Sequence, residues 1–343
     1  TAANLGYSSI ALTDHNGIYG SMAFAQEAKQ LGLQAITGAE VTLLDGSHVT
    51  LLAETPSGYA NLCRLLTEAH LGQADRRDPR LDFASLEARH DGLIILSGCR
   101  SGLLPRALER DGIAAARRLV DRCRAVFGPD QFFVELQRNL VRGDRALTRA
   151  LNDLASDARL SIVASGNVHY HQRERHRLHD VLVAIRHRAT LDGSHAARRQ
   201  NSEFFLRPPE DVAAMFADCP DAVDTTFAIA ERCKAFDLTR DLGYKFPDFR
   251  GAPDHSGPQA LAELCRSRLE ERYPTGSDHR DEAERRLAEE LRLIAHHGLC
   301  GFFLVYHDLF DLAREVAADV RRGSRRAAGG LLPGRGRGSS VSS

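Results

Sequence analysis

The 343-residue sequence lacks the features that would assign it to a membrane, to an oxidising compartment or to a polyanion. No apolar run approaches the roughly 20 residues of a membrane-spanning helix, and no signal peptide precedes Thr1. Lys and Arg number 45 against 46 Asp and Glu, so the formal charge of −1 gives no global basic excess. These absences favour a cytoplasmic location without a membrane partner.

The cysteine spacing of a disulfide framework or a zinc finger is also missing. A reducing cytoplasm therefore fits the cysteine usage best. Because the sequence begins with Thr1 rather than Met, we expect further sequence upstream. The seven cysteines are odd in number and are scattered through predicted helices, at Cys63, Cys99, Cys123, Cys219, Cys233, Cys265 and Cys300.

The sequence has a normal globular composition, with 43% hydrophobic residues, and its length is enough for roughly two domains. Up to about residue 187, short apolar runs alternate with amphipathic helices, which predicts a parallel α/β architecture. Asp45-Gly46 predicts an antiparallel hairpin within it. Helices dominate beyond Arg188, and we place a domain boundary between residues 195 and 205. Only the glycine-rich tail is locally basic, with Arg321, Arg322, Arg325, Arg326, Arg335 and Arg337.

The periodicity of apolar residues predicts the individual elements. Strands are expected at 8–13, 35–40, 41–44, 48–53, 93–96, 132–136 and 160–164. Helices are expected at 21–31, 57–70, 83–89, 113–127, 144–158, 175–187, 209–216, 222–233, 258–271 and 281–297.

Potential metal ligands follow several of these strands. Asp14-His15, Glu40, Cys99 and His169 end or follow a strand, and His48 begins the return strand of the hairpin. The carboxyl ends of parallel strands share one rim, so we expect these side chains to converge. Imidazole, carboxylate and thiolate suit zinc, and carboxylate with imidazole also suits manganese or iron. Such a cluster would hold water as hydroxide for attack on a phosphate ester.

Each of these residues also has an ordinary structural explanation. Residues 14–17 could form only an Asx turn, Glu40 could be a surface carboxylate, Cys99 a buried cysteine and His48 a solvated hairpin residue. We prefer a shared site, because independent surface residues need not gather after strands. Exposed helix or loop roles are assigned to His171, His176, His179, His187 and His195.

Five motifs resemble, in order, those of the PHP (polymerase and histidinol phosphatase) domain of bacterial DNA polymerase III alpha subunits. They are Thr13-Asp14-His15, Gly38-Ala39-Glu40, His48 with the segments 51–53 and 58–62, Ser97-Gly98-Cys99, and Asn167-Val168-His169-Tyr170. The resemblance covers most of residues 1–200. It implies a distorted seven-stranded β/α barrel whose rim binds up to three metal ions, which would be Zn, Mn or Fe.

Carried over residue by residue, the resemblance implies a set of metal ligands. These would be His15, Glu40, His48, Cys99 and His169, with Asp14 as a residue that orients His15. Two departures from the family pattern stand out. The first strand of the barrel, with its His-x-His motif, would lie upstream of Thr1. Asn167 stands at the position of a metal-binding aspartate, and a neutral amide binds divalent metals less strongly than a carboxylate.

The second half resembles the part of the same family that leads into the polymerase palm. Residues 201–207, 215–222 and 228–233 resemble the segment that joins the PHP domain to the palm. Residues 241–249 are most similar to the error-prone branch, and 297–308 to a passage from helix to strand. The tail 334–340 is similar to a Gly-Arg-Gly-Ser loop that touches the incoming triphosphate, which implies nucleotide contacts from Arg337, Gly338 and Ser339.

The resemblance as a whole implies the N-terminal part of a DNA-directed DNA polymerase, with a PHP domain at 1–200 and a linker plus the start of the palm at 201–343. The whole protein would carry out template-directed synthesis in replication, repair or translesion synthesis, with primer-template DNA, dNTP and a sliding clamp as partners. Its paired catalytic aspartates, which bind Mg, would lie beyond Ser343, so no catalytic residue is assigned here and the fragment is expected not to extend a primer. Two alternatives stay open. They are a metal-dependent PHP phosphoesterase or 3′–5′ exonuclease, and a structural barrel whose site has decayed.

Overall fold

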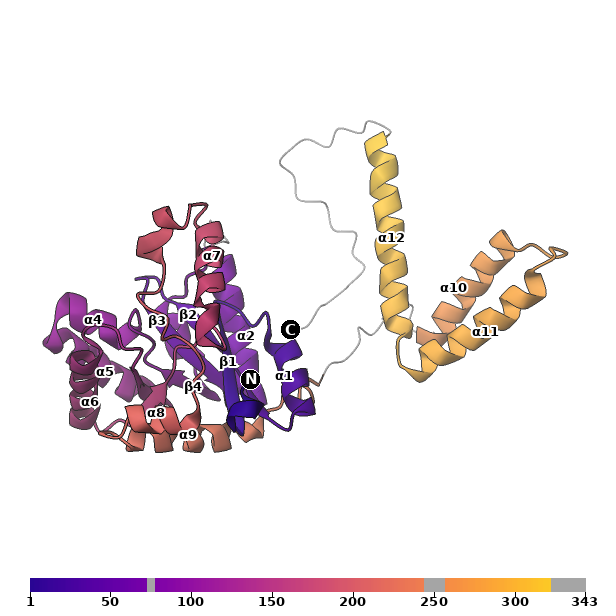
Figure 1. Ribbon diagram of the computed structural model, residues 1–343. Coiled ribbons are helices and arrows are strands. Elements are labelled where there is room, and N and C mark those ends of the chain that lie inside the picture. Colours follow the sequence, from indigo (N-terminus) through magenta and orange to yellow (C-terminus); the bar gives the residue numbers. More distant parts are fainter. Residues whose placement is uncertain (73–77, 244–256, 322–343) are drawn as a thin grey trace. The chain divides into compact units, whose positions relative to one another are not determined.

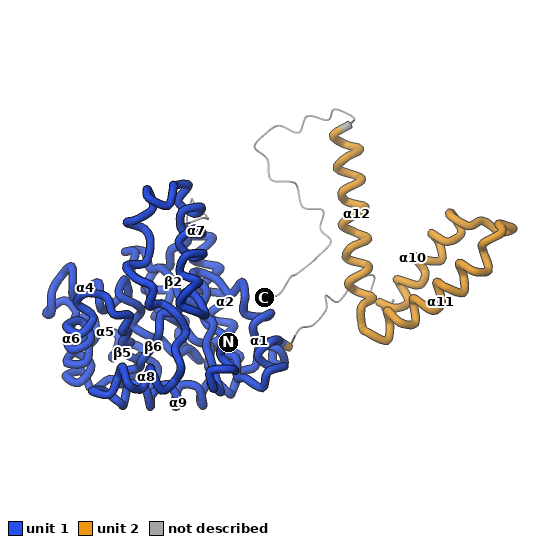
Figure 2. Tube along the Cα trace, viewed as in Figure 1, with its two compact units in different colours: residues 1–242 blue, residues 243–343 orange. Residues whose placement is uncertain are grey.

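The computed structural model describes residues 1–72, 78–243 and 257–321. They fall into two compact units, 1–242 and 243–343, which are described separately below (Figure 2).

The first unit is built on a six-stranded mixed sheet that curls into an open half-barrel (Figure 1). The strands neighbour one another in chain order. The pairs β1–β2, β4–β5 and β5–β6 are parallel, whereas β3 runs antiparallel to both β2 and β4. The predicted α/β alternation and the antiparallel excursion are thus confirmed. The strands are β1 (Ser9–His15), β2 (Gln34–Thr42), β3 (His48–Ala53), β4 (Leu93–Leu96), β5 (Phe132–Gln137) and β6 (Ile162–Ser165).

The hairpin between β2 and β3 is stabilised by the residues of its own turn. Gly46 has φ +81°, a conformation that costs an L side chain energy. Oδ1 of Asp45 accepts hydrogen bonds from the backbone N–H and the hydroxyl of Ser47, at 2.8 and 2.6 Å. The turn therefore fixes the register that brings His48 opposite Thr42.

Helices cover both faces of this sheet. Thr55 caps α2 by accepting a hydrogen bond from the Gly58 N–H, and Pro56 occupies the first turn. The sequence missed α4, which is separated from α5 only by Gly112. The helices of this unit are α1 (Ser21–Gln30), α2 (Pro56–Leu71), α3 (Phe83–Ala88), α4 (Leu103–Asp111), α5 (Ile113–Phe127), α6 (Asp144–Ala158), α7 (His176–Arg186), α8 (Pro209–Met215) and α9 (Asp221–Arg232).

The compact first unit continues beyond the change of sequence character at 195–205. Ile229 and Ala230 of α9 are buried against apolar residues of the sheet, in a cluster that includes Phe133 and Val163. Arg232 adds an ion pair to Glu54 at 2.8 Å. These contacts tie α9 to the sheet, and the first unit extends to residue 242.

The second unit contains α10 (Gly257–Arg272), α11 (Arg280–His296) and α12 (Cys300–Arg321). Its small core includes Leu261, Cys300 and Leu304. Gly298 has φ +65° after the end of α11, as expected of a glycine that ends a helix. The passage from helix to strand expected at 297–308 is instead a passage from helix to helix, because the i, i+4 pair Cys300 and Leu304 gives α12 a buried helical face.

The predicted nucleotide contacts Arg337, Gly338 and Ser339 lie outside the described residues. None of the helices in the described ranges combines the length and the apolar character needed to cross a membrane.

Candidate metal centre

Three potential ligands converge at one end of the first three strands. Parallel register places His15 beside Glu40, and the hairpin brings His48 to the same place. Oε1 of Glu40 lies 3.1 Å from Nδ1 of His15 and 3.0 Å from Nδ1 of His48. One ligand atom from each residue lies within 4.8 Å of the other two, and no other group of three such side chains was found in the part of the chain that is described. We call His15, Glu40 and His48 the three-donor cluster.

The electrostatics of Glu40 favour its charged form. Burial alone would raise the pKa of this carboxyl, but hydrogen bonds from His15 and His48, together with their charges, outweigh it and hold the pKa well below its usual range. A carboxylate therefore stands between two imidazoles, which is the donor chemistry of zinc, manganese and iron sites.

A buried hydroxyl that the sequence analysis missed holds His15. Oγ1 of Thr42 lies 3.2 Å from Nε2 of His15. Thr42 is itself fixed by Asn16, whose side-chain amide donates to Oγ1 at 3.0 Å and whose Oδ1 accepts from the Thr42 N–H at 2.8 Å. This support leaves Nδ1 of His15 directed at Glu40. The only indication of this support in the sequence is that Asn16 directly follows His15.

Asp14 contacts the loop before α1, and its role as a partner of His15 stays a prediction. Its Oδ2 accepts a hydrogen bond from the Gly20 N–H at 2.7 Å, at the start of α1. The structure thus shows Asp14 fixing the loop after β1, while Thr42 contacts the imidazole.

Cys99 adjoins the three-donor cluster, with its Sγ 3.7 Å from Nδ1 of His48. Gly98 makes this approach possible, because a Cβ on Gly98 would come within 2.3 Å of the His48 carbonyl oxygen. Burial raises the pKa of the Cys99 thiol to about 12, with a smaller contribution from Glu40. The thiol is therefore neutral at physiological pH unless a cation displaces its proton.

His169 and Asn167 lie on the far side of the rim and are paired with each other. Nε2 of His169 is 3.1 Å from Oδ1 of Asn167, and its ring lies 5.4 Å from that of His179 and 5.9 Å from that of Phe204. Burial, followed by the positive charges of Arg199 and His179, lowers the pKa of His169 to about 3, so the imidazole is neutral and able to bind a metal. His169 is not part of the three-donor cluster, and its role as a ligand stays a prediction.

Glu135 on β5 is a second residue that the sequence analysis missed. It is 4% exposed, and its Oε2 has no hydrogen-bond partner, while Oε1 accepts from Gln137 at 2.9 Å and from Ser165. Desolvation raises the pKa of this carboxyl, which favours its neutral form. The available signal was a carboxylate inside the otherwise apolar run 132–136.

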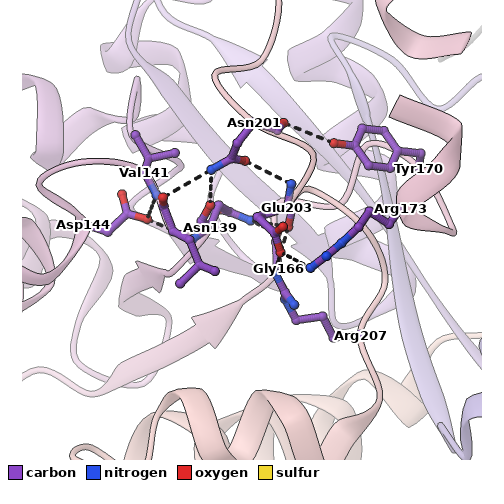
Figure 3. Close-up of polar contacts among 10 residues, drawn as sticks. Asn139, Val141, Asp144, Gly166, Tyr170, Arg173, Asn201, Glu203 and Arg207 are labelled. Carbon is purple, nitrogen blue, oxygen red and sulfur yellow. Dashed lines mark hydrogen bonds and ion pairs between the residues drawn. The ribbon is translucent and has the colours of Figure 1, made fainter. Parts of the chain in front are cut away.

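A cavity of about 300 Å³ adjoins Cys99 and reaches Glu135. One wall is the segment 196–204, which crosses the carboxyl ends of β5 and β6. Figure 3 shows how polar contacts hold that segment: the Asn201 amide donates to the carbonyl oxygen of Asn139 at 2.8 Å, and the Asn139 amide donates to that of Gly166 at 2.8 Å. Glu203 pairs with both Arg173 and Arg207, at 2.7 and 2.5 Å.

The donor set fits a divalent metal ion. In a tetrahedral site with bonds of about 2.0–2.1 Å the donor atoms lie roughly 3.3 Å apart. The two distances from Glu40 to the histidines and the 3.7 Å between Cys99 and His48 are close to that spacing. The three-donor cluster therefore has the chemistry and the close spacing of a divalent metal site, and Cys99 adjoins it at His48.

Comparison with known proteins finds relatives for both parts of the chain. Residues 1–139 match the PHP domain family, and residues 259–343 match the family described as Bacterial DNA polymerase III alpha NTPase domain. An error-prone DNA polymerase of Symbiobacterium thermophilum is 39% identical over 331 residues, covering 92% of this chain and 30% of that protein. The error-prone DNA polymerase of Mycobacterium tuberculosis is 36% identical over 330 residues, covering 92% and 29%.

The DNA polymerase III subunit alpha of Thermus aquaticus is 28% identical over 396 residues, covering 94% of this chain and 32% of that protein. The resemblance to alpha subunits is thus confirmed over both halves of the sequence. The chain spans about 30% of the length of these curated relatives.

Proposed function

We propose that this chain is the N-terminal part of a bacterial DNA polymerase of the DNA polymerase III alpha family, of the error-prone type. The observation that carries the proposal is that sequence similarity to such polymerases extends over 92% of the chain, through both the PHP part and the helical part. The whole protein would be a nucleotidyltransferase that copies primer-template DNA from dNTPs in the cytoplasm, in damage-tolerant synthesis and repair.

The proposal extends to parts that the described residues do not include. Arg337, Gly338 and Ser339 would contact the incoming nucleotide's phosphates, since glycine lets backbone N–H groups approach an anion and arginine adds charge. Catalytic aspartates with Mg and a binding motif for a sliding clamp would lie beyond Ser343. A seventh strand would complete the β/α barrel beside β1, which pairs only with β2 among the described strands.

Primer extension tests this assignment. The full-length product of the gene, purified and supplied with Mg²⁺ and dNTPs, should extend a primer on an undamaged template and past an abasic site. Residues 1–343 alone should not extend the primer on either template. Failure of the full-length protein on both templates would contradict the polymerase assignment. Primer extension by the fragment would contradict the proposal that the catalytic aspartates lie beyond Ser343.

We propose in addition that the three-donor cluster and Cys99 hold a Zn, Mn or Fe ion in the PHP part. When bound, the ion would supply Lewis acidity and an activated water for phosphoester hydrolysis. The chain's own residues would prepare the site. Glu40 gives negative charge between two imidazoles, Thr42 fixes the direction of His15, and Cys99 would release its proton on binding.

Metal analysis separates this proposal from a decayed barrel. The fragment, purified without chelator, should contain about one equivalent of zinc, manganese or iron, and less than one equivalent after reconstitution with each would contradict an intact centre. A phosphoesterase or 3′–5′ exonuclease is the second candidate function, favoured by the convergence of the donors. Release of phosphate or 3′-terminal nucleotides by the metal-loaded full-length protein would support it, whereas full metal occupancy without either activity would support a structural role.

A further inference from the structure

Asn16, which directly follows His15 of the three-donor cluster, has a backbone conformation that its partners must maintain. Its φ is +52°, in the left-handed region where an L side chain is strained, although asparagine tolerates it better than most residues. Asn16 is 8% exposed, so its polar groups depend on partners within the protein. Its backbone N–H donates to the carbonyl oxygen of Glu40 at 2.7 Å, and its side-chain amide forms the two bonds to Thr42 described above. Asn16 thus connects His15 with two residues of β2.

The remaining polar group of Asn16, its carbonyl oxygen, is bound by a histidine from a distant part of the chain. Nε2 of His70 lies 2.8 Å from this oxygen. Because a carbonyl oxygen can only accept a hydrogen bond, Nε2 of His70 carries the proton and donates it. His70 lies in the last turn of α2, whose side chains Leu66 and Ala69 are buried in the core. The bond therefore attaches the loop after β1 to a helix that is held by the core.

The bond between His70 and Asn16 lies among apolar side chains. Both residues line a cavity of about 450 Å³, and Ile18, Leu66 and Leu71 form much of its remaining wall. In such surroundings a hydrogen bond is stronger than in water, and the loss of its donor leaves a carbonyl oxygen that is difficult to satisfy. Removal of the His70 ring is therefore expected to release Asn16 from its left-handed conformation.

We propose that His70 and Asn16 are positioning residues of the metal centre, through which α2 fixes the direction of the His15 ring. His70 holds the Asn16 backbone, and the Asn16 amide holds Thr42. Thr42 in turn contacts Nε2 of His15 at 3.2 Å, which leaves Nδ1 of the ring directed at Glu40. The effect on metal binding rests on the metal centre proposed above, whereas the effect on the His15 ring does not require an ion.

Metal affinity and metal spectroscopy on residues 1–343 test this positioning. Equilibrium dialysis gives the affinity for Mn²⁺, and the EPR spectrum of the bound ion reports its ligand geometry. We expect His70→Ala to weaken binding by about tenfold and to change the spectrum, because the orientation of a ligand is lost. His70→Gln should recover most of the affinity, since its amide nitrogen can donate from about the position of Nε2. His90→Ala, which removes a half-buried histidine hydrogen-bonded to Gln131 at 2.8 Å, is the matched control and should bind as the wild type.

Asn16→Gly keeps the proposal testable if His70→Ala does not fold. Glycine adopts φ +52° without strain and keeps the backbone groups, so this variant loses only the two side-chain bonds to Thr42. It should fold and lose about tenfold in Mn²⁺ affinity. Circular dichroism during heating checks the folding of each variant. Wild-type affinity in a folded variant of either residue would overturn the positioning role, as would a loss in His90→Ala as large as in His70→Ala.

An NMR measurement without metal separates this inference from the metal centre. A carboxylate only accepts hydrogen bonds, so Nδ1 of the neutral His15 ring carries the proton that faces Glu40. In metal-free wild type at pH 8, the ¹⁵N signals of His15 should show this single tautomer, whereas His70→Ala should show a mixture of both. If the wild type binds no metal, the metal centre is overturned, and identical His15 signals in wild type and His70→Ala would then overturn the positioning as well.

Discussion

The two sides of the rim, the near side at β1, β2 and β3 and the far side at β5 and β6, differ in the charge of their side chains. On the side of β1, β2 and β3, an imidazole, a carboxylate and a second imidazole point at one another with separations of 3.0 and 3.1 Å. On the side of β5 and β6, His169 is paired with the neutral amide of Asn167, and Glu135 is buried with a raised pKa. One side is prepared for a cation, and the other consists of groups that favour their uncharged forms.

The difference follows from the sheet. Strand pairing sets the distance between side chains on neighbouring strands. It places His15 beside Glu40, and the hairpin places His48 opposite Thr42. Cys99 follows the next strand, β4, and lies just outside the cluster. β6 is five places from β1 in the strand order, so only the curl of the sheet brings its end towards the first strand. The distances between ligands on β1, β2 and β3 are therefore set by local strand pairing, whereas the distance from the end of β6 to β1 depends on the curvature of the whole sheet.

The largest effect is expected from removing the charge at the centre of the prepared side. Glu40→Gln keeps the shape but takes away the anion between two imidazoles, so the affinity for Mn²⁺ or Zn²⁺ should fall by about 100-fold or more. Equilibrium dialysis with the fragment measures the change. Glu87→Gln, at a surface ion pair with Arg122, should bind metal as the wild type. Equal metal affinity for Glu40→Gln and Glu87→Gln would show that the three-donor cluster is not the metal site.

A smaller effect is expected from loosening the support of His15. Thr42→Val removes the hydroxyl 3.2 Å from Nε2 and should weaken metal binding by about tenfold, while Thr42→Ser should restore it. Thr37→Val changes a buried threonine of the same strand that lies outside the cluster and serves as the control. Loss of affinity in Thr37→Val as large as in Thr42→Val would mean that the strand, and not the hydroxyl, matters.

Asn167→Asp would give the far side a carboxylate, as Glu40 does on the near side. A carboxylate beside His169 should bind a second divalent ion or strengthen the first, and we expect an increase of a few-fold in Mn²⁺ affinity. Asn61→Asp, at a half-buried position of α2, controls for the added charge. Unchanged binding in Asn167→Asp would indicate that His169 lies too far from the cluster to share its ion.

The sequence predicted the near side well because its information is local. Strand ends, the Asp45-Gly46 turn and the order of motifs were enough to bring His15, Glu40 and His48 together. Thr42 and Glu135 were missed because their importance depends on burial and on partners from other elements, Asn16 in one case and Ser165 in the other. The position of α9 against the sheet could not be predicted for the same reason, since only packing shows the contacts of Ile229 and Ala230.

The smallest effect is expected at Glu135, and it concerns stability. The pKa of this carboxyl is raised in the folded protein, so the folded state binds a proton that the unfolded state has already lost above its ordinary pKa of about 4.5. Folding stability should therefore fall as pH rises from 5 to 8, by about 1.4 kcal/mol for each unit by which the pKa is raised. Glu135→Gln cannot titrate and should lose this part of the slope, while keeping the acceptor for Ser165 and Gln137. Urea denaturation of both proteins at pH 5 and pH 8 measures the slopes, with Glu87→Gln, at the ion pair with Arg122, as the control. Parallel slopes for wild type and Glu135→Gln would show that the buried carboxyl is ionised, and the contrast between a charged near side and a neutral far side would then be lost.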